Sequence, residues 1–121
     1  MMAKRILVLD DEPGFRDVMK DVLAEHGYEV EATPYIASAV AQAVRRNYDL
    51  ITLDLRIPGL DGLEIAQLFS RTGIQTPVLV ISGYLDDSVT QELKANGISH
   101  FLDKPTDIPD LLSAVEGAMA A

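Results

Sequence analysis

The sequence predicts an α/β fold in which a doubly wound, five-stranded parallel sheet is covered by helices on both faces. Short apolar runs alternate five times with segments whose apolar residues recur every three or four positions. A helix between two strands acts as a crossover, so the strands pair in parallel. With 121 residues, 48% of them hydrophobic, the chain suits one domain with its own core, spanning residues 1–121.

The first half of the chain predicts two strands and two helices. Lys4 to Leu9 is an apolar strand that stops at three consecutive acids, residues 10–12. Pro13 suits the first turn of a helix that Gly27 ends. The apolar markers are Phe15, Val18, Met19, Val22 and Leu23 in the first helix, Tyr28, Val30 and Ala32 in the second strand, and Ile36, Val40, Ala43 and Val44 in the second helix.

The second half of the chain continues this alternation of strands and helices. Leu50 to Leu53 is a buried strand that ends at Asp54, and a Pro-Gly turn separates it from a helix that starts at Leu63. The fourth strand, Val78 to Ile81, ends at Ser82. A helix from Asp86 to Ala95, a strand from Ser99 to Leu102 and a helix with apolar residues at Ile108, Leu111, Leu112, Val115 and Met119 complete the chain.

Strand composition predicts the order of the strands. The first, third and fourth are the most apolar, as central strands buried on both faces must be, whereas the second is polar and suits an edge. This pattern favours the order 2-1-3-4-5 in a flavodoxin-like three-layer sandwich.

Composition excludes several classes of function. The 19 acidic and 10 basic residues give a net charge of −9, and the basic residues are scattered, so we expect no direct binding of nucleic acid. The absence of cysteine excludes a disulfide scaffold and a thiolate metal site. We expect a cytoplasmic protein without membrane contact, because neither a membrane-spanning run nor a signal peptide is visible.

Residues with carboxylate, hydroxyl or amine side chains follow four of the predicted strands. Since parallel strands share one carboxyl edge, we expect Asp10, Asp11, Asp54, Ser82 and Lys104 to converge there. Each residue alone also fits a turn, a helix cap or a solvated surface position. Together, the acids repel each other by about 4 kcal/mol per pair at about 4 Å and a dielectric constant near 20, and a cation must offset this repulsion. Oxygen ligands without histidine or cysteine favour Mg²⁺, with Lys104 as a second positive charge.

This residue set permits phosphoryl transfer to a carboxylate. Asp54 would be the nucleophile, Lys104 and the metal would neutralise the phosphoryl oxygens, and the Ser82 hydroxyl would donate a hydrogen bond to one of them.

From Lys4 to the last helix, the chain resembles a response-regulator receiver domain of two-component signal transduction, of the chemotaxis-regulator type. The resemblance implies a signalling domain that catalyses only its own phosphorylation and dephosphorylation. It implies that Asp54 accepts a phosphoryl group from a sensor histidine kinase or phosphotransfer protein. Asp10, Asp11, Asp54 and the backbone carbonyl of Arg56 would hold Mg²⁺, and Pro105 would follow a cis peptide bond.

The resemblance further implies a conformational switch. Ser82 would move towards the phosphoryl group and Phe101 would turn inward, changing the face formed by the fourth helix, the fifth strand and the fifth helix, which is also a candidate homodimer surface. An ordinary core position is the alternative for Phe101, which lacks the tyrosine hydroxyl of many relatives. Arg56 and Tyr84, two positions beyond Asp54 and Ser82, border the site and predict slow self-dephosphorylation.

Three other functions remain as alternatives. A haloacid-dehalogenase-like phosphatase needs an Asp-x-Asp motif, where this chain has Asp10-Asp11-Glu12. A flavin-binding protein needs a Ser/Thr-Gly-rich loop after Leu9, and none follows. A receiver-like module could bind partners without phosphorylation. The sequence does not reveal the cognate kinase, the signal, or whether an output domain belongs to the same protein.

Overall fold

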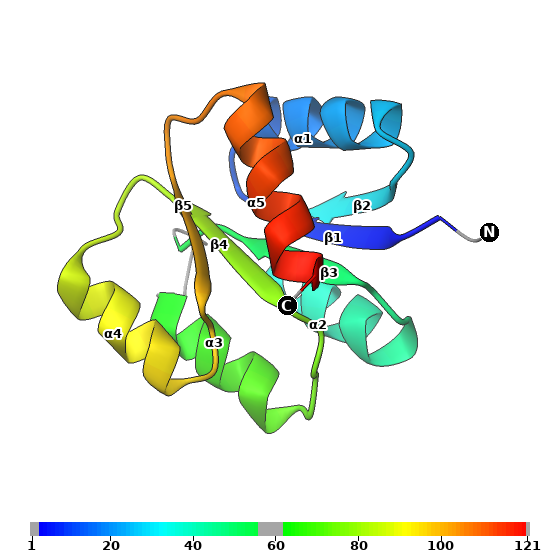
Figure 1. The fold of residues 1–121 in the computed structure, drawn as a ribbon. Helices are drawn as coiled ribbons and strands as arrows, with labels where there is room; N and C mark the ends of the chain where they lie inside the picture. The colour runs from blue at the N-terminus through cyan, green and yellow to red at the C-terminus, as the bar shows by residue number, and fades with distance from the viewer. Residues whose placement is uncertain (1–2, 56–61, 121) are drawn as a thin grey trace.

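The computed structural model describes residues 3–55 and 62–120, which form a three-layer sandwich of helices, sheet and helices (Figure 1). Five strands and five helices alternate along the chain, as the sequence predicted. In chain order they are β1 Arg5–Leu9, α1 Pro13–Glu25, β2 Glu29–Thr33, α2 Ile36–Arg45, β3 Leu50–Leu53, α3 Gly62–Arg71, β4 Val78–Ser82, α4 Asp87–Ala95, β5 His100–Asp103 and α5 Ile108–Ala120.

The sheet is parallel throughout, and its order, β2-β1-β3-β4-β5, confirms the prediction. The central strands β1 and β3 are buried along almost their whole length, whereas β2 lies at an edge. Ion pairs line this edge: Arg5 Nε lies 2.9 Å from Glu29 Oε2, and Arg46 Nη1 lies 2.5 Å from Glu31 Oε1. The polar residues that weakened the apolar pattern of β2 therefore mark its place at the margin of the sheet.

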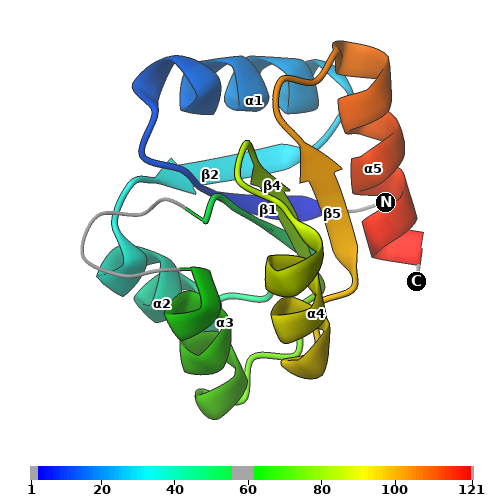
Figure 2. The ribbon, with the colours of Figure 1, turned by 90° about the vertical axis from the view of Figure 1, so that its left-hand side faces the viewer.

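Each face of the sheet has its own core. Helices α1 and α5 cover one face, and α2, α3 and α4 cover the other (Figure 2). Alternate residues of β1 serve the two cores: Ile6 and Val8 pack with α1 and α5, while Leu7 and Leu9 pack with the other three helices. A strand with helices on both sides must be apolar at every position, which explains the continuous runs in the sequence.

Two valines and one isoleucine that we assigned to apolar helix stripes lie on the surface. Val18 is 52% exposed, Val44 is 63% exposed, and Ile108, the first residue of α5, is 49% exposed. At 100° per residue, each valine stands roughly 90° from the centre of the stripe that its helix buries. The three- and four-residue spacing therefore identified both helices but overestimated the width of their buried faces.

Several boundaries differ by one residue from the sequence prediction. Strand β1 starts at Arg5 rather than at Lys4, β4 continues to Ser82 rather than to Ile81, and β5 runs from His100 to Asp103 rather than from Ser99 to Leu102. Helix α3 starts at Gly62 rather than at Leu63. Helix α4 begins at Asp87, because the Asp86 carboxylate accepts a hydrogen bond from the Val89 N–H at 2.8 Å and so caps the helix from outside.

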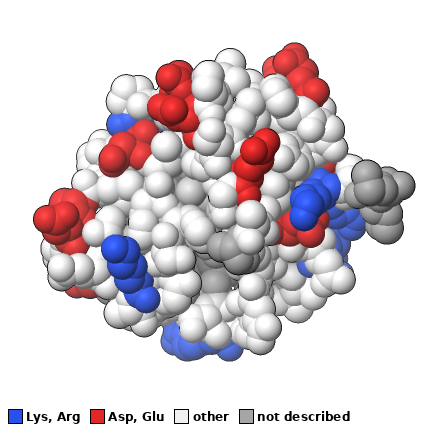
Figure 3. All heavy atoms as spheres, viewed as in Figure 1, with Lys and Arg blue, Asp and Glu red and all other residues white. Residues whose placement is uncertain are grey.

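On the face shown in Figure 3, acidic and basic side chains are interspersed among uncharged residues. Within residues 3–55 and 62–120, no helix has the length and apolar character that crossing a bilayer requires.

Candidate functional site

The candidate site lies at the carboxyl edge of the sheet, where the ends of β1, β3, β4 and β5 meet. Two backbone hydrogen bonds align these ends. The Asp54 N–H donates to the Leu9 carbonyl at 3.0 Å, and the Lys104 N–H donates to the Ser82 carbonyl at 3.0 Å. The fold thus brings together residues from four separate strand ends, as the topology predicted.

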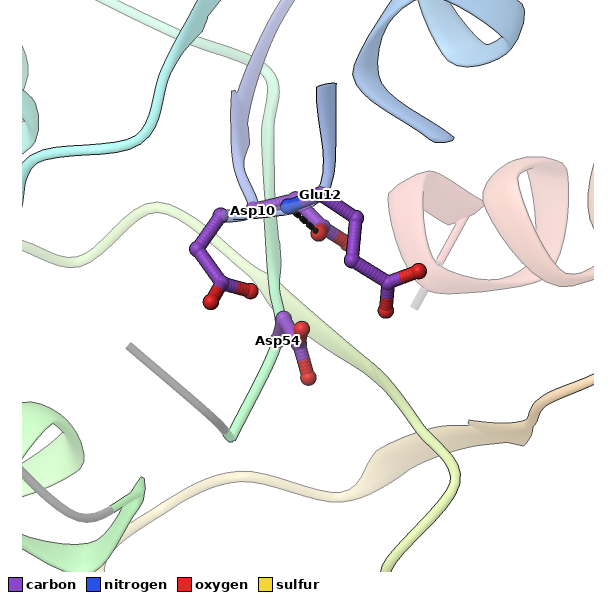
Figure 4. Close-up of side chains that lie close together, drawn as sticks. Asp10, Glu12 and Asp54 are labelled. Carbon is purple, nitrogen blue, oxygen red and sulfur yellow. Dashed lines mark hydrogen bonds between the residues drawn. The ribbon is translucent and has the colours of Figure 1, made fainter. Parts of the chain in front are cut away.

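Four acids gather at this edge. One carboxylate oxygen from each of Asp10, Asp11, Glu12 and Asp54 lies within 4.8 Å of the others. Figure 4 shows Asp10 and Glu12, which follow β1, beside Asp54, which follows β3. Asp10 is 2% exposed and Asp54 is 4% exposed, whereas Asp11 is half-buried and Glu12 is exposed. The cluster therefore has a buried inner pair and a solvent-facing outer pair.

Burial raises the pKa of Asp10 above its ordinary value. The Glu12 N–H, which donates to Asp10 Oδ1 at 2.9 Å, and the Lys104 ammonium oppose this effect, while the charge of Asp54 adds to it. The raised pKa indicates that the Glu12 N–H and the Lys104 ammonium do not fully offset the free-energy cost of burying the ionised Asp10 carboxylate. An additional cation at this edge would lower the free energy of the ionised cluster.

Lys104 places its ammonium among the acids. Its Nζ lies 3.0 Å from Asp10 Oδ2, 3.1 Å from Glu12 Oε1 and 3.5 Å from Asp54 Oδ2. Burial alone would lower the pKa of Lys104, but the hydrogen bond and charge of Asp10, with Glu12 and Asp54, outweigh burial and raise it. The side chain therefore remains a cation at neutral pH.

A cleft of about 620 Å³ opens over the acids and Lys104. Its lining also includes Phe15, Tyr84, Pro105 and Thr106. Lys104 Nζ lies 4.1 Å from the centre of the Phe15 ring, which is within the range of a cation–π contact. A group that enters the cleft thus meets a carboxylate, an ammonium and apolar walls.

The structure places the other predicted residues as follows. Ser82 is fully buried, and its hydroxyl accepts a hydrogen bond from the Tyr84 N–H at 3.1 Å. Phe101 is half-buried and packs against the core beneath α4. The Lys104–Pro105 peptide bond is cis. Arg56, whose carbonyl we predicted as a metal ligand, lies outside the described residues.

The donors at this edge fit Mg²⁺. Carboxylate oxygens are the ligands that a hard divalent cation prefers, and neither histidine nor cysteine belongs to the cluster that the structure describes here. Asp10, Asp11 and Asp54 are the ligands predicted from the sequence, and Glu12 lies beside them.

Sequence reasoning missed two residues of this site. Glu12 was assigned no role, although its place directly after Asp11 at a strand end was a visible signal. Phe15 was counted only as a core marker of α1, because its spacing matched the helix stripe. Both residues contact Lys104, which lies about ninety positions further along the chain.

Comparisons with known proteins agree with this geometry. The family model of the response regulator receiver domain matches residues 6–116. Sporulation initiation phosphotransferase F of Bacillus subtilis is 32% identical over 117 residues, which cover 96% of this chain and 94% of that protein. The chemotaxis protein CheY4 of Vibrio cholerae has a similar structure, with a TM-score of 0.90 and 27% identity over 97% of this chain and 99% of that chain.

Other relatives are much longer than this chain. The response regulator protein PilR of Pseudomonas aeruginosa is 32% identical over 120 residues, covering 98% of this chain but 27% of PilR. The chain likewise spans 51% of the response regulator MprA of Mycobacterium sp. strain KMS. Because the family model matches residues 6–116, which is most of the chain, and the sheet order is the expected one, the chain belongs to the response regulator receiver domains of two-component signalling.

Proposed function

We propose that this receiver domain is the phosphoacceptor of a His-Asp phosphorelay and that Asp54 is the accepting residue. The observation that carries the proposal is the position of Lys104, whose Nζ lies 3.5 Å from Asp54 Oδ2 and 3.0 Å from Asp10 Oδ2. A buried carboxylate beside an ammonium and three further acids is suited to receive a phosphoryl group together with a metal ion.

The proposed reaction is an in-line displacement at phosphorus. An Asp54 carboxylate oxygen forms a bond to the phosphorus of a phosphohistidine on the partner, while the phosphorus–nitrogen bond breaks and the imidazole keeps the electron pair and takes up a proton. The product is an acyl phosphate on Asp54. Later attack by water on this phosphorus releases inorganic phosphate and restores the carboxylate.

Protein groups prepare the site for the charge that develops. Lys104 stays protonated and neutralises the phosphoryl oxygens. Ser82, at the end of β4, donates its hydroxyl hydrogen to one of them, because its hydrogen bond with the Tyr84 N–H uses only the oxygen as acceptor. Asp10, Asp11 and Asp54, with the carbonyl of Arg56, would hold Mg²⁺, which supplies further positive charge when bound.

We further propose that phosphorylation changes the face formed by α4, β5 and α5, through Ser82 and Phe101. Phe101, like Val89 of α4, is partly buried against the core cluster that contains Leu93 of α4, so a small displacement of this ring would be transmitted to α4 through that core. Receiver domains of this family interact with histidine kinases or phosphotransfer proteins. A homodimer through the same face and a cytoplasmic location remain predictions.

The test of this function is the intact mass after incubation with Mg²⁺ and acetyl phosphate. We expect a gain of one phosphoryl group that requires both Mg²⁺ and Asp54 and is therefore missing in Asp54→Asn and in EDTA. If the protein gains no mass although it binds Mg²⁺, transfer from a phosphorylated cognate kinase is the second measurement. Failure of both would leave a receiver that binds partners without phosphorylation.

A further inference from the structure

Lys104 has two contacts outside the proposed phosphoryl and metal site. The Glu12 carboxylate lies 3.1 Å from its Nζ, and the Phe15 ring lies 4.1 Å away. Glu12 is the outermost of the three acids on Lys104, since its side chain is 62% exposed while those of Asp10 and Asp54 are 3% and 4% exposed. Both residues come from the start of α1 and the turn before it.

The inner contacts of Lys104 conflict with metal binding. Asp10 and Asp54 are the two buried carboxylates that would bind a divalent cation, and the Lys104 ammonium already contacts one oxygen of each. Two positive groups that share the same oxygens weaken each other's binding. Lys104 must nevertheless remain in the cleft if it is to neutralise a phosphoryl group on Asp54. Contacts that do not compete with the metal would solve this conflict.

We propose that Glu12 and Phe15 are positioning residues that anchor Lys104 on the outer side of the cleft while Asp10 and Asp54 bind the metal ion. Glu12 supplies the opposite charge, and the Phe15 ring supplies a face that orients the ammonium and shields it from water. This inference rests on the proposed phosphoacceptor function, but its central test is metal binding, which does not require phosphorylation.

A different role for Glu12 predicts the opposite result. Because its carboxylate lies within 4.8 Å of the other acids, Glu12 could itself be a metal ligand. As an anchor, Glu12 draws Lys104 away from the metal oxygens, so its loss weakens Mg²⁺ binding more when Lys104 is present. If Glu12 is instead a metal ligand, Lys104 competes with Mg²⁺ for the Glu12 carboxylate. Removal of that carboxylate then weakens Mg²⁺ binding more when Lys104 is absent.

A double-mutant cycle separates the two roles. Mg²⁺ affinity is measured by calorimetry for the wild type, Glu12→Gln, Lys104→Met and the double variant. We expect the loss of affinity caused by Glu12→Gln to be at least about threefold larger in the presence of Lys104 than in its absence. Asp17→Asn, which removes an exposed charge further along α1, controls for net charge. The anchor role would be overturned if Glu12→Gln lowered Mg²⁺ affinity equally in both backgrounds or more strongly without Lys104. It would also be overturned if Glu12→Gln lowered Mg²⁺ affinity no more than Asp17→Asn does.

The contribution of Phe15 has a spectroscopic signature. A ring 4.1 Å from Nζ shifts the proton resonances of the Lys104 side chain upfield, and Phe15→Leu, which keeps an apolar side chain, should remove this shift. We also expect the rate of phosphorylation by acetyl phosphate to fall about threefold at saturating Mg²⁺. Lys104 resonances that Phe15→Leu leaves unchanged would overturn the role of the ring.

The two proposals can fail separately. If the wild type is not phosphorylated on Asp54, the phosphoacceptor function fails, while the Mg²⁺ cycle and the Lys104 resonances still report on the anchor. If phosphorylation requires Asp54 but the cycle shows no coupling of the expected sign, only the anchor fails.

Discussion

The Lys104 ammonium lies 3.0 Å from the Asp10 carboxylate, although 94 residues separate them in the chain. This contact joins the end of β1 to the end of β5 across the carboxyl edge of the sheet. The pKa of each group is raised: burial dominates for Asp10, and the surrounding acids dominate over burial for Lys104. The site therefore holds more negative charge than its own lysine compensates, which favours the ligands that we propose for it.

The first prediction is that Asp10 destabilises the metal-free fold. A raised pKa means that the folded state favours the protonated carboxyl, so this stabilisation is present in full below the ordinary value of 3.8 and is lost as the pH rises through the folded value. Asp10→Asn keeps an oxygen for the Glu12 N–H. In EDTA at pH 7.5, it should raise the free energy of unfolding by about 1 kcal/mol, measured by urea denaturation.

Excess Mg²⁺ provides the control for this effect. At about one hundred times its dissociation constant, a ligand stabilises the fold by about 2.7 kcal/mol, and Asp10→Asn should gain much less of this stabilisation than the wild type. The order of stability should therefore reverse between EDTA and Mg²⁺. An Asp10→Asn variant that is less stable than the wild type in EDTA would show that the ionised carboxylate is not a net destabilising group.

Lys104 should have the opposite effect on stability. Because its pKa is raised, the contribution of its charge is present in full below the ordinary value of 10.5 and is lost only as the pH rises through the higher folded value. In EDTA, Lys104→Met should lower the free energy of unfolding by about 2 kcal/mol, almost constantly from about pH 7 to about pH 10. Lys94→Met, at an exposed position on α4, is the matched control. An effect no larger than that control would contradict the prediction.

Tyr84 should slow the hydrolysis of the phosphoaspartate. Its side chain is 54% exposed, and the residue lines the cleft above Asp54, where it obstructs the approach of water. Tyr84→Ala should therefore shorten the lifetime of the phosphorylated protein severalfold, measured by the loss of the added mass after the phosphodonor is removed. Tyr35→Ala, which changes another exposed tyrosine, should leave the lifetime unchanged. An equal lifetime for Tyr84→Ala and the wild type would exclude this role.

Arg56 should also slow the hydrolysis of the phosphoaspartate. This prediction rests on the sequence alone, because Arg56 lies outside the described part of the chain. The same mass measurement on Arg56→Ala, with Arg71→Ala on α3 as the control, should show a shortened lifetime for the first variant only. An unchanged lifetime would remove Arg56 from the explanation of slow hydrolysis.

The fold could be predicted because its signals are local. Continuous apolar runs such as Leu50 to Leu53 reflect burial on both faces, and the acids of β2 reflect an edge position. The exposed Val18 and Val44 show the limit of this reasoning, since spacing does not give the width of a helix contact. The start of α4 moved by one residue because the Asp86 side chain caps the helix from outside.

The site could be predicted as a set of strand-end residues but not as a set of contacts. Topology alone brings Asp10, Asp54 and Lys104 to one edge of the sheet. The contacts of Glu12 and Phe15 with Lys104 depend on side-chain conformations and on how α1 leaves β1, which no spacing in the sequence encodes. For the same reason, the sequence did not show that the Ser82 hydroxyl is bonded to the Tyr84 N–H.

The last prediction separates phosphorylation from switching through Ser82. Its buried hydroxyl accepts a hydrogen bond from the Tyr84 N–H, and Phe101 is only partly buried against the core. We expect both residues to move when a phosphoryl group arrives. Ser82→Ala removes the hydroxyl but leaves Asp54 and Lys104 in place. It should therefore still accept a phosphoryl group from acetyl phosphate, at a reduced rate, because one hydrogen-bond donor to that group is missing.

The amide resonances of α4 and β5 report on the switch. In the wild type and in Ser88→Ala, a control at an exposed position on α4, these resonances should move when Asp54 is phosphorylated. In Ser82→Ala they should stay close to their unphosphorylated positions, even when the mass shows full phosphorylation. Equal movements in Ser82→Ala and the wild type would show that the signal reaches α4 without this hydroxyl, and Phe101 would then have to respond to the phosphoryl charge alone.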